Sequence, residues 1–494
     1  MGSAVQNSRK VAVIGAGAAG LASIKELLAE GHAVTGFEQG AKPGGVWVYD
    51  DATDSDLLSA SQSRRKVHGS MYRDLRTNLP RELMGFAELP FTPAAMGPAS
   101  SDPRRFCSHR EVLAYLDVFA GMHQQHQHVH FNTQVLQATP LPAASSNSSS
   151  NSSSSRRWQV QSVRLGPDGQ PQQQPQQQEF DALVVANGHY SEPNLPQVPG
   201  SSGWPGLQMH SHNYRAPEAF RDQVVVVVGA SNSGEDVCRE VSAVASQVIL
   251  AARSWKNPAW GDDPRPFGPR NNVSRRGMIS QLHPDGRVDF TQGPALPAAD
   301  AIIYCTGYRY KFPFLEQHPD TAGLSGQQHV PGLYQHMFVP QLGPSLAFVG
   351  LPWKVVPFPQ FELQAKLIAR LLSGRAQLPP VSEMQAHRAA HYAQMQAEGV
   401  PLRHCHMMGE QQWAYNDWLA EAAGADVAKL PAWRAAMYAS TGVNKRAHPD
   451  DYRDRWDDAS SAAAAEAELA VLTQQLKALH PAAAAAAAAA AVAS

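Results

Sequence analysis

Two stretches of the chain have the hydrophobic pattern of a buried strand that is followed at once by a glycine-rich turn and a helix. In the first, residues 11–14 form an unbroken apolar run, and residues 21–28 have apolar positions at helical spacing. In the second, residues 224–228 supply the apolar run, and a turn rich in Gly and Ser follows. This order of elements opens the parallel units that bind dinucleotides. The pattern therefore predicts an α/β fold with two dinucleotide-binding (Rossmann-like) domains.

A third patterned region predicts a small separate sheet. The sequence RRWQVQSVRL alternates like a strand, with Trp158, Val160 and Val163 on its inward face. It lies between a Ser/Asn-rich segment at 145–155 and a Gln/Pro-rich segment at 170–178. Such segments bury too little apolar surface to offset the entropy cost of ordering them. We expect both to be loops of this sheet.

The C-terminal part, from about residue 462, is rich in alanine and contains a few charged residues. Alanine has the highest helix propensity, and Pro481 is the first residue that would interrupt a helix. We expect a peripheral helix here, followed by a frayed end.

Composition narrows the class of protein. The chain has 494 residues, 43% of them hydrophobic and 17% charged; this is enough for two to four domains, and it excludes a wholly disordered chain. The net charge of −2 gives no reason to expect binding to nucleic acid or to an anionic membrane. We find no apolar run of about 18 residues and no secretory signal, and Gln6 breaks the myristoylation motif. We expect a soluble, cytoplasmic protein without membrane contact.

The cysteines and histidines predict neither disulfides nor a metal site. The four cysteines lie far apart, which excludes the short spacings of zinc sites and redox dithiols: Cys107, Cys238, Cys305 and Cys405. Four histidines between positions 123 and 130 have no matching cluster elsewhere, so we expect them at the surface. Without a redox dithiol, electrons from a nicotinamide must pass to an acceptor other than a disulfide.

The first turn has the residues that a diphosphate needs. Gly15 permits the tight turn, Gly17 lets the diphosphate approach the backbone, and Gly20 lets helix and strand pack closely. Ala16, Ala18 and Ala19 complete the loop. Glu38 ends the next predicted strand, where a carboxylate can accept hydrogen bonds from ribose hydroxyls.

The second turn differs in two informative ways. Ser231 replaces the middle glycine of the sequence Gly229, Ala230, Ser231, Asn232, Ser233 and Gly234. The next strand is followed by Arg253 instead of an acid, and an arginine can pair with a 2′-phosphate. This favours NADPH over NADH, although a solvated surface arginine is the alternative.

The segment WPGLQMHSHNY, residues 204–214, resembles the FxGxxxHxxxY signature of flavin-containing monooxygenases. Gly206, His210 and Tyr214 match the signature, and Trp204 stands in place of its phenylalanine. Four further segments agree with the same family: GGVW at 44–47, MYRDLRTNLP at 71–80, FDALVVANGHYSEPNLPQVPG at 180–200 and IIYCTGYRY at 302–310. The resemblance covers about residues 9–440 and is greatest to plant-type S-oxygenating members, similar to glucosinolate S-oxygenases.

The resemblance implies a set of site residues. The FAD contacts would be the loop from Gly15 to Gly20, Glu38, Val46, Trp47, Asn78 and Leu79, and the NADP contacts would be Thr77, Asn78, the turn from Gly229 to Gly234 and Arg253. His210 and Tyr214 would contribute to cofactor binding from a linker that couples NADPH docking to the flavin domain. A helix beginning near Phe361 would place Gln364 near the flavin pyrimidine. Asn78 would be the catalytic residue between flavin and nicotinamide; an ordinary turn asparagine is the alternative.

The resemblance also implies domains and a reaction. An NADP domain at 206–334 would be inserted between two parts of an FAD domain, 1–205 and 335–494. NADPH and O2 would generate a flavin hydroperoxide that oxygenates a small soft nucleophile at thioether sulfur or amine nitrogen. The alternatives are a Baeyer–Villiger or keto-acid decarboxylating monooxygenase, and a redox sensor that binds both nucleotides without turnover. The oligomeric state stays open, with a homodimer as one option.

Overall fold

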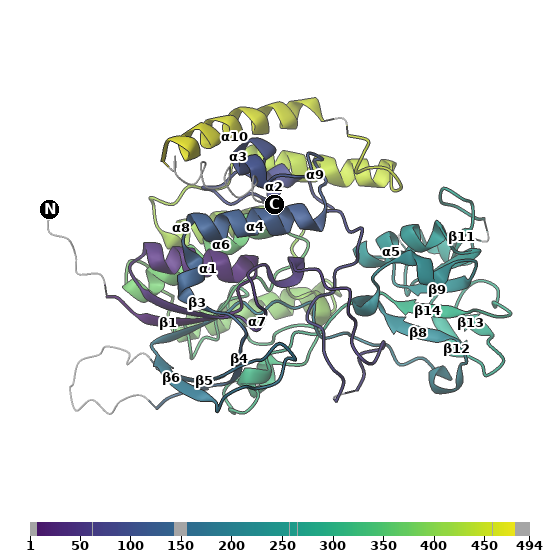
Figure 1. Cartoon of the computed structure of the whole chain (residues 1–494), viewed down its shortest axis with the longest axis horizontal. Coiled ribbons are helices and arrows are strands. Elements are labelled where there is room, and N and C mark those ends of the chain that lie inside the picture. The colour runs from purple at the N-terminus through teal and green to yellow at the C-terminus, as the bar shows by residue number, and fades with distance from the viewer. Residues whose placement is uncertain are drawn as a thin grey trace.

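The computed structural model describes residues 7–61, 63–142, 156–255, 257–263, 265–456 and 458–479. It has two lobes, each built around a five-stranded parallel sheet (Figure 1). The smaller lobe is the teal part of the chain at one side of the molecule. The expectation of an α/β fold with two Rossmann-like units is confirmed.

The sheet of the larger lobe has the order β15-β7-β1-β2-β3. Its strands are β1 (Lys10–Ile14), β2 (Ala33–Phe37), β3 (Val129–His130), β7 (Ala182–Val185) and β15 (Leu346–Phe348). Alternate residues of β1 enter two different cores. Val11 and Val13 pack with helices α1 (Ala18–Ala29), α6 (Pro357–Ser373) and α8 (Gln411–Ala423). Ala12 and Ile14 pack with the small sheet on the opposite face, so both faces are buried and every strand position can be apolar.

The small antiparallel sheet consists of β4 (Thr133–Pro140), β5 (Trp158–Arg164) and β6 (Gln176–Phe180). Trp158, Val160 and Val163 of β5 are buried, as predicted. The expectation that residues 170–178 form only a loop is wrong for 176–178, which pair with β5. Strand pairing uses backbone groups, so glutamines can occupy an exposed edge without an apolar pattern. Residues 145–155 lie outside the described residues.

The sheet of the smaller lobe has the order β11-β10-β9-β14-β8. Its strands are β8 (Leu207–His210), β9 (Val224–Val228), β10 (Gln247–Ala251), β11 (Val273–Arg276) and β14 (Ala301–Tyr304). Helix α5 (Asn232–Ser242) covers one face, and the hairpin of β12 (Ile279–Leu282) and β13 (Val288–Phe290) covers the other. All these strands fall between β7 and β15 in the chain.

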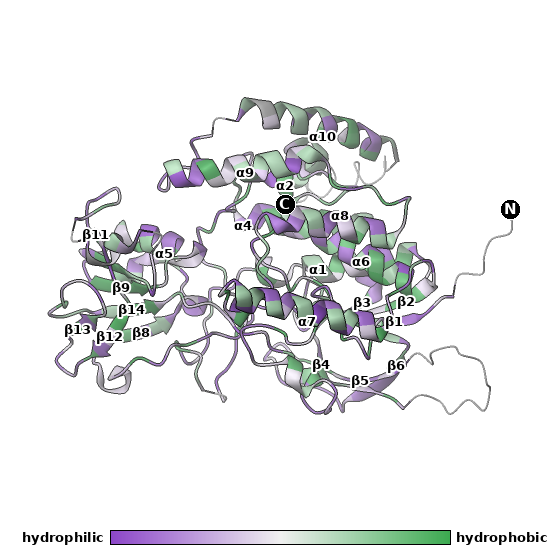
Figure 2. Ribbon diagram, turned by 180° about the vertical axis from the view of Figure 1, so that it is seen from behind, coloured by the Kyte–Doolittle hydropathy of each residue, from purple (hydrophilic) through white to green (hydrophobic). Residues whose placement is uncertain are grey.

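The remaining helices surround the larger lobe: α2 (Arg81–Met84), α3 (Pro93–Met96), α4 (His109–Met122), α7 (Val381–Ala397), α9 (Ala432–Ala447) and α10 (Ala459–Leu479). Helix α7 lies on the outside with mixed hydropathy (Figure 2), and only Met384 and Met395 of its residues are buried. None of the helices in the described ranges is long and apolar enough to cross a membrane.

Helix α10 confirms the expected alanine-rich helix. It rests on α9, where Ala465 and Leu469 join a core with Leu83, Trp433 and Met437. The indole Nε1 of Trp433 also donates a hydrogen bond to Glu468, 2.8 Å away. Among the described side chains of this helix, Leu469 is the only large apolar one that is buried, so the docking of the helix depends strongly on it.

Replacing Leu469 by alanine should loosen α10 without unfolding the two lobes. Deleting a buried leucine side chain costs about 2–5 kcal/mol, and Leu469 is only 4% exposed. Hydrogen exchange over residues 459–479 should rise in Leu469→Ala. The matched control is Val471→Ala, since Val471 is 53% exposed. Equal exchange in the two variants would contradict the proposed docking.

Candidate functional site

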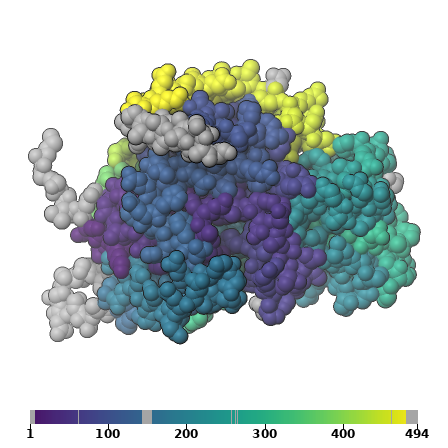
Figure 3. Space-filling model, viewed as in Figure 1, coloured from purple at the N-terminus to yellow at the C-terminus, as the bar shows by residue number. Residues whose placement is uncertain are grey.

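A large cavity of about 2080 Å³ lies between the two lobes. This exceeds the roughly 300–1,000 Å³ of an ordinary small-molecule pocket. Both glycine turns line it, together with residues 44–48, 64–69, 77–79, 186–192 and 352–355 and the C-terminal half of α9. Figure 3 shows the purple N-terminal part of the chain lying against the teal lobe at the front of the molecule. The cavity therefore has room for two long ligands at once.

Close contacts with backbone carbonyl oxygens leave room only for glycine at two positions of the first turn. Gly15 has φ +102°, and a Cβ there would lie 2.5 Å from the carbonyl oxygen of Ala186. A Cβ on Gly20 would lie 1.9 Å from the carbonyl oxygen of Gly15. Gly17, Ala18 and Ala19 face the cavity with Gly15, while Ala16 and Gly20 lie outside its wall. The start of α1 thus presents backbone N–H groups to the cavity, as a diphosphate requires.

Glu38 ties this turn to the second strand. Its Oε2 accepts a hydrogen bond from the N–H of Ala16 at 2.8 Å, and its Oε1 accepts from Gly40 at 2.7 Å. Glu38 lines the cavity and is 8% exposed. A carboxylate has more acceptor sites than these two bonds use, so it can still accept from a ribose hydroxyl.

The second turn repeats the geometry of the first. Gly229 has φ +115° and lies over the carbonyl oxygen of Cys305, and a Cβ on Gly234 would lie 1.7 Å from the carbonyl oxygen of Gly229. Ser231 has φ −106° and needs no glycine. Ala230, Ser231 and Asn232 line the cavity, whereas Gly229, Ser233 and Gly234 do not. The start of α5 therefore faces the same cavity as the start of α1.

Arg253 is exposed and does not line the cavity. The cavity wall beside it carries Ser254, Trp255 and Arg275 instead. The guanidinium of Arg275 lies 3.8 Å from the ring centroid of Phe267 and 4.6 Å from that of Trp260. Sequence reasoning missed Arg275 because it lies on β11, one strand further along the sheet, in parallel register with β10.

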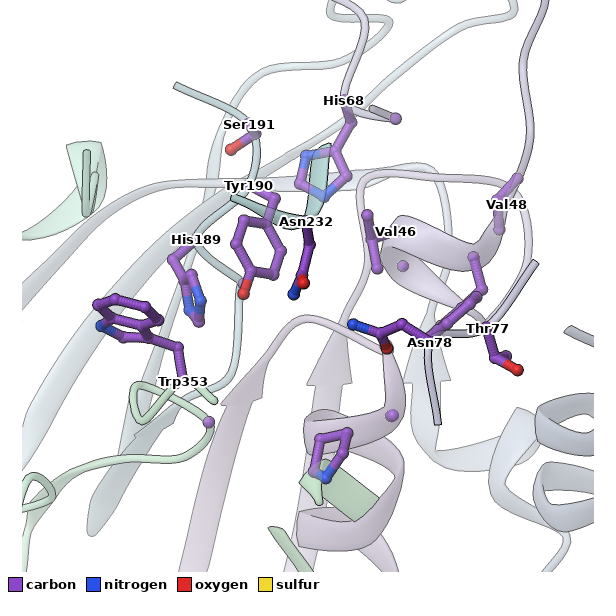
Figure 4. A pocket seen from close by; sticks show the side chains of 18 of the residues that line it. Val46, Val48, His68, Thr77, Asn78, His189, Tyr190, Ser191, Asn232 and Trp353 are labelled. Atoms are coloured by element: carbon purple, nitrogen blue, oxygen red, sulfur yellow. The ribbon is translucent and has the colours of Figure 1, made fainter. Parts of the chain in front are cut away.

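Asn78 lines the cavity. Its amide points into the space that it shares with Asn232 and Val46, whereas the hydroxyl of Thr77 points away (Figure 4). Val46, Trp47, Thr77 and Leu79 also line the wall. The amide of Asn78 makes no hydrogen bond with the described part of the chain, so both its donor and its acceptor are available to a ligand.

An aromatic wall that sequence reasoning missed stands across the cavity from Asn78. His189, Tyr190 and Trp353 face the space with His68 (Figure 4). The imidazole of His189 packs on Tyr190 and Tyr310, with centroid separations of 4.2 and 5.0 Å. Burial lowers the pKa of His189 to about 4, so its ring is neutral near pH 7. The GHY sequence of the family-like segment at 180–200 was the available signal.

The signature residues His210 and Tyr214 do not line the cavity. Both are fully buried. The Nδ1 of His210 accepts a hydrogen bond from the N–H of His212 at 3.1 Å, and the hydroxyl of Tyr214 donates to Glu240 of α5 at 2.8 Å. Burial lowers the pKa of His210 to about 3. The expectation of direct cofactor contacts here is corrected, because these side chains fill an interface.

That interface joins the lobes, as the predicted linker requires. The amide oxygen of Asn213 accepts from the N–H of Asp54, and its nitrogen donates to the carbonyl of Leu57. The guanidinium of Arg215 donates to the carbonyls of Ala52 and Gly69. The signature segment and the adjoining Arg215 therefore hold residues 50–69 over the cavity.

Helix α6 begins at Pro357 instead of near Phe361, and Gln364 is not on the cavity wall. Its buried amide accepts a hydrogen bond from the N–H of Gly350 and donates to the hydroxyl of Tyr415, both at 3.0 Å. Gln364 therefore lies behind the cavity wall. It fixes Gly350, which does line the cavity.

Among the described residues, His336, Cys405 and His406 form a group with ligand atoms close enough to hold a metal ion. Their hydrogen bonds argue against that use. The Nε2 of His406 accepts from the N–H of Val330 at 3.0 Å, so the proton of this neutral ring sits on Nδ1. That Nδ1 faces the Nδ1 of His336 at 3.0 Å. His336 and His406 therefore bind each other through a hydrogen bond instead of a metal ion.

All four cysteines of the chain are free and buried.

Glu240 predicts a pH dependence of stability. Burial raises its pKa to about 7 against the hydrogen bond from Tyr214, which lowers it. The folded chain therefore holds a proton that the unfolded chain releases near pH 4.5. This stabilisation is present at low pH and is lost as pH rises to about 7. In the parent protein the free energy of unfolding should fall as the pH rises from about 4.5 to about 7. In Glu240→Gln this fall, measured by urea unfolding, should be smaller by on the order of 1–3 kcal/mol. An unchanged slope would contradict the assignment.

Comparisons with known proteins agree with this geometry. The family model for flavin-binding monooxygenase-like proteins matches residues 8–261 and 271–431. The flavin-containing monooxygenase FMO GS-OX-like 4 of Arabidopsis thaliana is 44% identical over 91% of this chain and 95% of its own length. The solved structure of S-allyl-L-cysteine S-oxygenase from Allium sativum has a TM-score of 0.84 and 41% identity, covering 94% of this chain and 100% of that one.

A more distant structure, Tmm from Pelagibacter sp. strain HTCC7211, has a TM-score of 0.72 and 24% identity over 90% of this chain and 93% of its own. It supports the fold alone. The resemblance inferred from the signature segment is confirmed by the family match and by relatives with more than 40% identity. The chain belongs to the flavin-binding monooxygenase-like family.

Proposed function

We propose that the protein binds FAD and NADPH and uses O2 to transfer one oxygen atom to a small soft nucleophile, with a thioether sulfur preferred to an amine nitrogen. One observation carries this proposal: two equivalent glycine turns open onto one cavity with Asn78 between them. The preference for sulfur is supported by the relatives, one named an S-allyl-L-cysteine S-oxygenase and others named GS-OX or GS-OX-like.

The larger lobe has the features that FAD needs. Gly17, Ala18 and Ala19 would take the diphosphate, and Glu38 would accept from the ribose. Val46 and Trp47 lie in a 3-10 turn beside Gly17, where a Cβ on Gly17 would approach Gly45 at 3.4 Å. This close passage of two backbones leaves no room for a side chain between Gly17 and Gly45. Bound FAD supplies the redox chemistry and the activation of oxygen.

The smaller lobe has the features that NADPH needs. Ala230, Ser231 and Asn232 at the start of α5 would take its diphosphate. We assign the 2′-phosphate to Arg275 together with Ser254, since both line the cavity. An arginine already packed against aromatic rings loses little entropy on binding a phosphate. We place the boundaries of the inserted NADP domain at residues 206 and 334.

The remaining residues control access to the reacting atoms. The amide of Asn78 can both donate and accept, and it carries no proton that it would lose near neutral pH. The aromatic wall excludes water, and His189 offers a neutral imidazole instead of an acid. Excluding water and stray protons favours transfer of oxygen to the substrate over release of peroxide. Four buried thiols without a disulfide fit a reducing compartment, and we propose the cytoplasm.

Product analysis with 18O2 tests this function. The FAD-loaded protein, NADPH and S-allyl-L-cysteine should give a sulfoxide that carries one labelled oxygen, with one NADPH oxidised for each product. A labelled ester or lactone from a ketone, without sulfoxide from the thioether, would favour the Baeyer–Villiger alternative. Bound FAD without any oxidation of NADPH would favour the sensor alternative.

Replacing Asn78 by alanine should uncouple the reaction. The loss of one preorganised donor at a reacting centre lowers turnover by about 100-fold. We expect Asn78→Ala to keep its FAD but to form sulfoxide about 100-fold more slowly, with NADPH oxidation diverted to H2O2. Gln396→Ala removes an exposed amide outside the cavity, and this control should behave as the parent. Full sulfoxide formation by Asn78→Ala would refute the catalytic role.

Two variants test whether Arg275, assigned from the structure, or Arg253, predicted from the sequence, binds the 2′-phosphate of NADPH. Arg275→Gln should raise the KM for NADPH by about 10–100-fold, as expected for losing a charged hydrogen bond, and should leave the KM for NADH nearly unchanged. Arg253→Gln should change either constant much less, because Arg253 lies off the wall. The reverse result would restore Arg253 as the phosphate ligand.

A further inference from the structure

Arg453 joins the two halves of the site from outside the cavity. It lies in the turn between α9 and α10, and its side chain is 11% exposed. Its Nη1 and Nη2 donate to the two carboxylate oxygens of Asp236 at 3.1 and 2.7 Å. Its Nε donates to the carbonyl oxygen of Thr77 at 2.9 Å. One planar guanidinium thus binds a carboxylate and a backbone carbonyl that belong to different lobes.

The two partners of Arg453 have informative positions. Thr77 immediately precedes Asn78, and its N–H is itself fixed by the carbonyl of Cys107 at 2.9 Å. Asp236 lies on α5, one turn after Asn232. A two-pronged arginine–carboxylate pair fixes orientation as well as distance. Arg453 therefore fixes the separation between Asn78 and the start of α5.

Neighbouring contacts tie the same two regions. The carboxylate of Asp236 also accepts from the hydroxyl of Tyr72 at 3.1 Å and from Arg239 at 2.8 Å. Lys445 at the end of α9 donates to the amide oxygen of Asn232 at 3.0 Å and pairs with Glu235 at 2.9 Å. Neither Arg453 nor Asp236 lines the cavity. Their effect on a ligand must pass through the residues that they hold.

We propose that Arg453 and Asp236 are a positioning pair that sets the distance of Asn78 from the NADP diphosphate turn and thereby couples NADPH oxidation to oxygen transfer. This inference rests on the proposed function. The coupled reaction converts NADPH, H⁺, O2 and a thioether into NADP⁺, water and a sulfoxide. When positioning fails, NADPH, H⁺ and O2 give NADP⁺ and H2O2, and the thioether is left unchanged.

The contacts of Arg453 depend on the planar, forked shape of its guanidinium as well as on its positive charge. A lysine at position 453 keeps the positive charge, but it cannot bind both carboxylate oxygens and the Thr77 carbonyl at once. The set of variants is therefore Arg453→Lys, Arg453→Gln, Asp236→Asn and the double variant Asp236→Asn/Arg453→Gln. Arg455→Gln is the matched control, since Arg455 is 65% exposed and 4.0 Å from its partner Asp451.

Four quantities are measured on the FAD-loaded proteins: FAD content, H2O2 released per NADPH oxidised, the Kd for NADP⁺ by calorimetry, and hydrogen exchange over residues 75–80. We expect FAD content to be unchanged in every variant. In each of the three single variants, the amount of H2O2 released per NADPH oxidised should rise several-fold, and the Kd for NADP⁺ should rise about tenfold. Hydrogen exchange over residues 75–80 should also increase. The double variant should resemble Arg453→Gln, because the two residues act as one unit.

Control-like behaviour of Arg453→Gln and Asp236→Asn in H2O2 release and NADP⁺ affinity would overturn the inference. Full rescue by Arg453→Lys would overturn the role of the fork. If Arg453→Gln loses FAD or unfolds, Asp236→Asn and Arg453→Lys decide the question. If the parent protein forms no sulfoxide, the proposed function fails; NADP⁺ affinity and hydrogen exchange then still test whether the pair positions the two lobes.

Discussion

Each nucleotide turn packs closely against the carbonyl oxygen of the residue that directly follows the neighbouring strand of the sheet. Ala186 supplies that oxygen under Gly15, and Cys305 supplies it under Gly229. No side chain fits at either glycine, since a Cβ would come within 2.5 Å of the oxygen below and both backbones have positive φ. Strand, turn and helix are thereby locked together, and each helix start faces the cavity. Everything proposed about function depends on this repeated constraint and on the fact that both turns open onto the same space.

The constraint fixes each half of the site but not the distance between the halves. That distance is set by polar contacts of the connecting segments. Asn213 of the signature segment and the adjoining Arg215 bind residues 50–69, and Arg453 links Thr77 to Asp236. Such bonds are directional, so they define an orientation where apolar contacts alone would permit sliding. Signature residues His210 and Tyr214 belong to this framework, which explains why a motif of this family contributes nothing to the cavity wall.

The sequence predicted the local features well because they are encoded locally. Strand, glycine turn and helix follow one another within about thirty residues, and the buried face of β5 was readable from alternation alone. Features that depend on contacts between residues far apart in the chain could not be predicted in this way. Arg275 lies next to the end of β10 only through sheet order, and Gln364 is drawn inward by Gly350 and Tyr415. Arg453 lies more than 370 residues from Thr77 in the chain, and no local pattern predicts such a contact.

The most direct test of the account is a structure of the protein with FAD and NADP⁺ bound. The FAD diphosphate should lie at the start of α1 and the NADP⁺ diphosphate at the start of α5, with the flavin and nicotinamide rings meeting beside Asn78 and the 2′-phosphate within hydrogen-bond distance of Arg275. A nicotinamide ring bound away from Asn78, or NADP⁺ bound outside the shared cavity, would contradict the account.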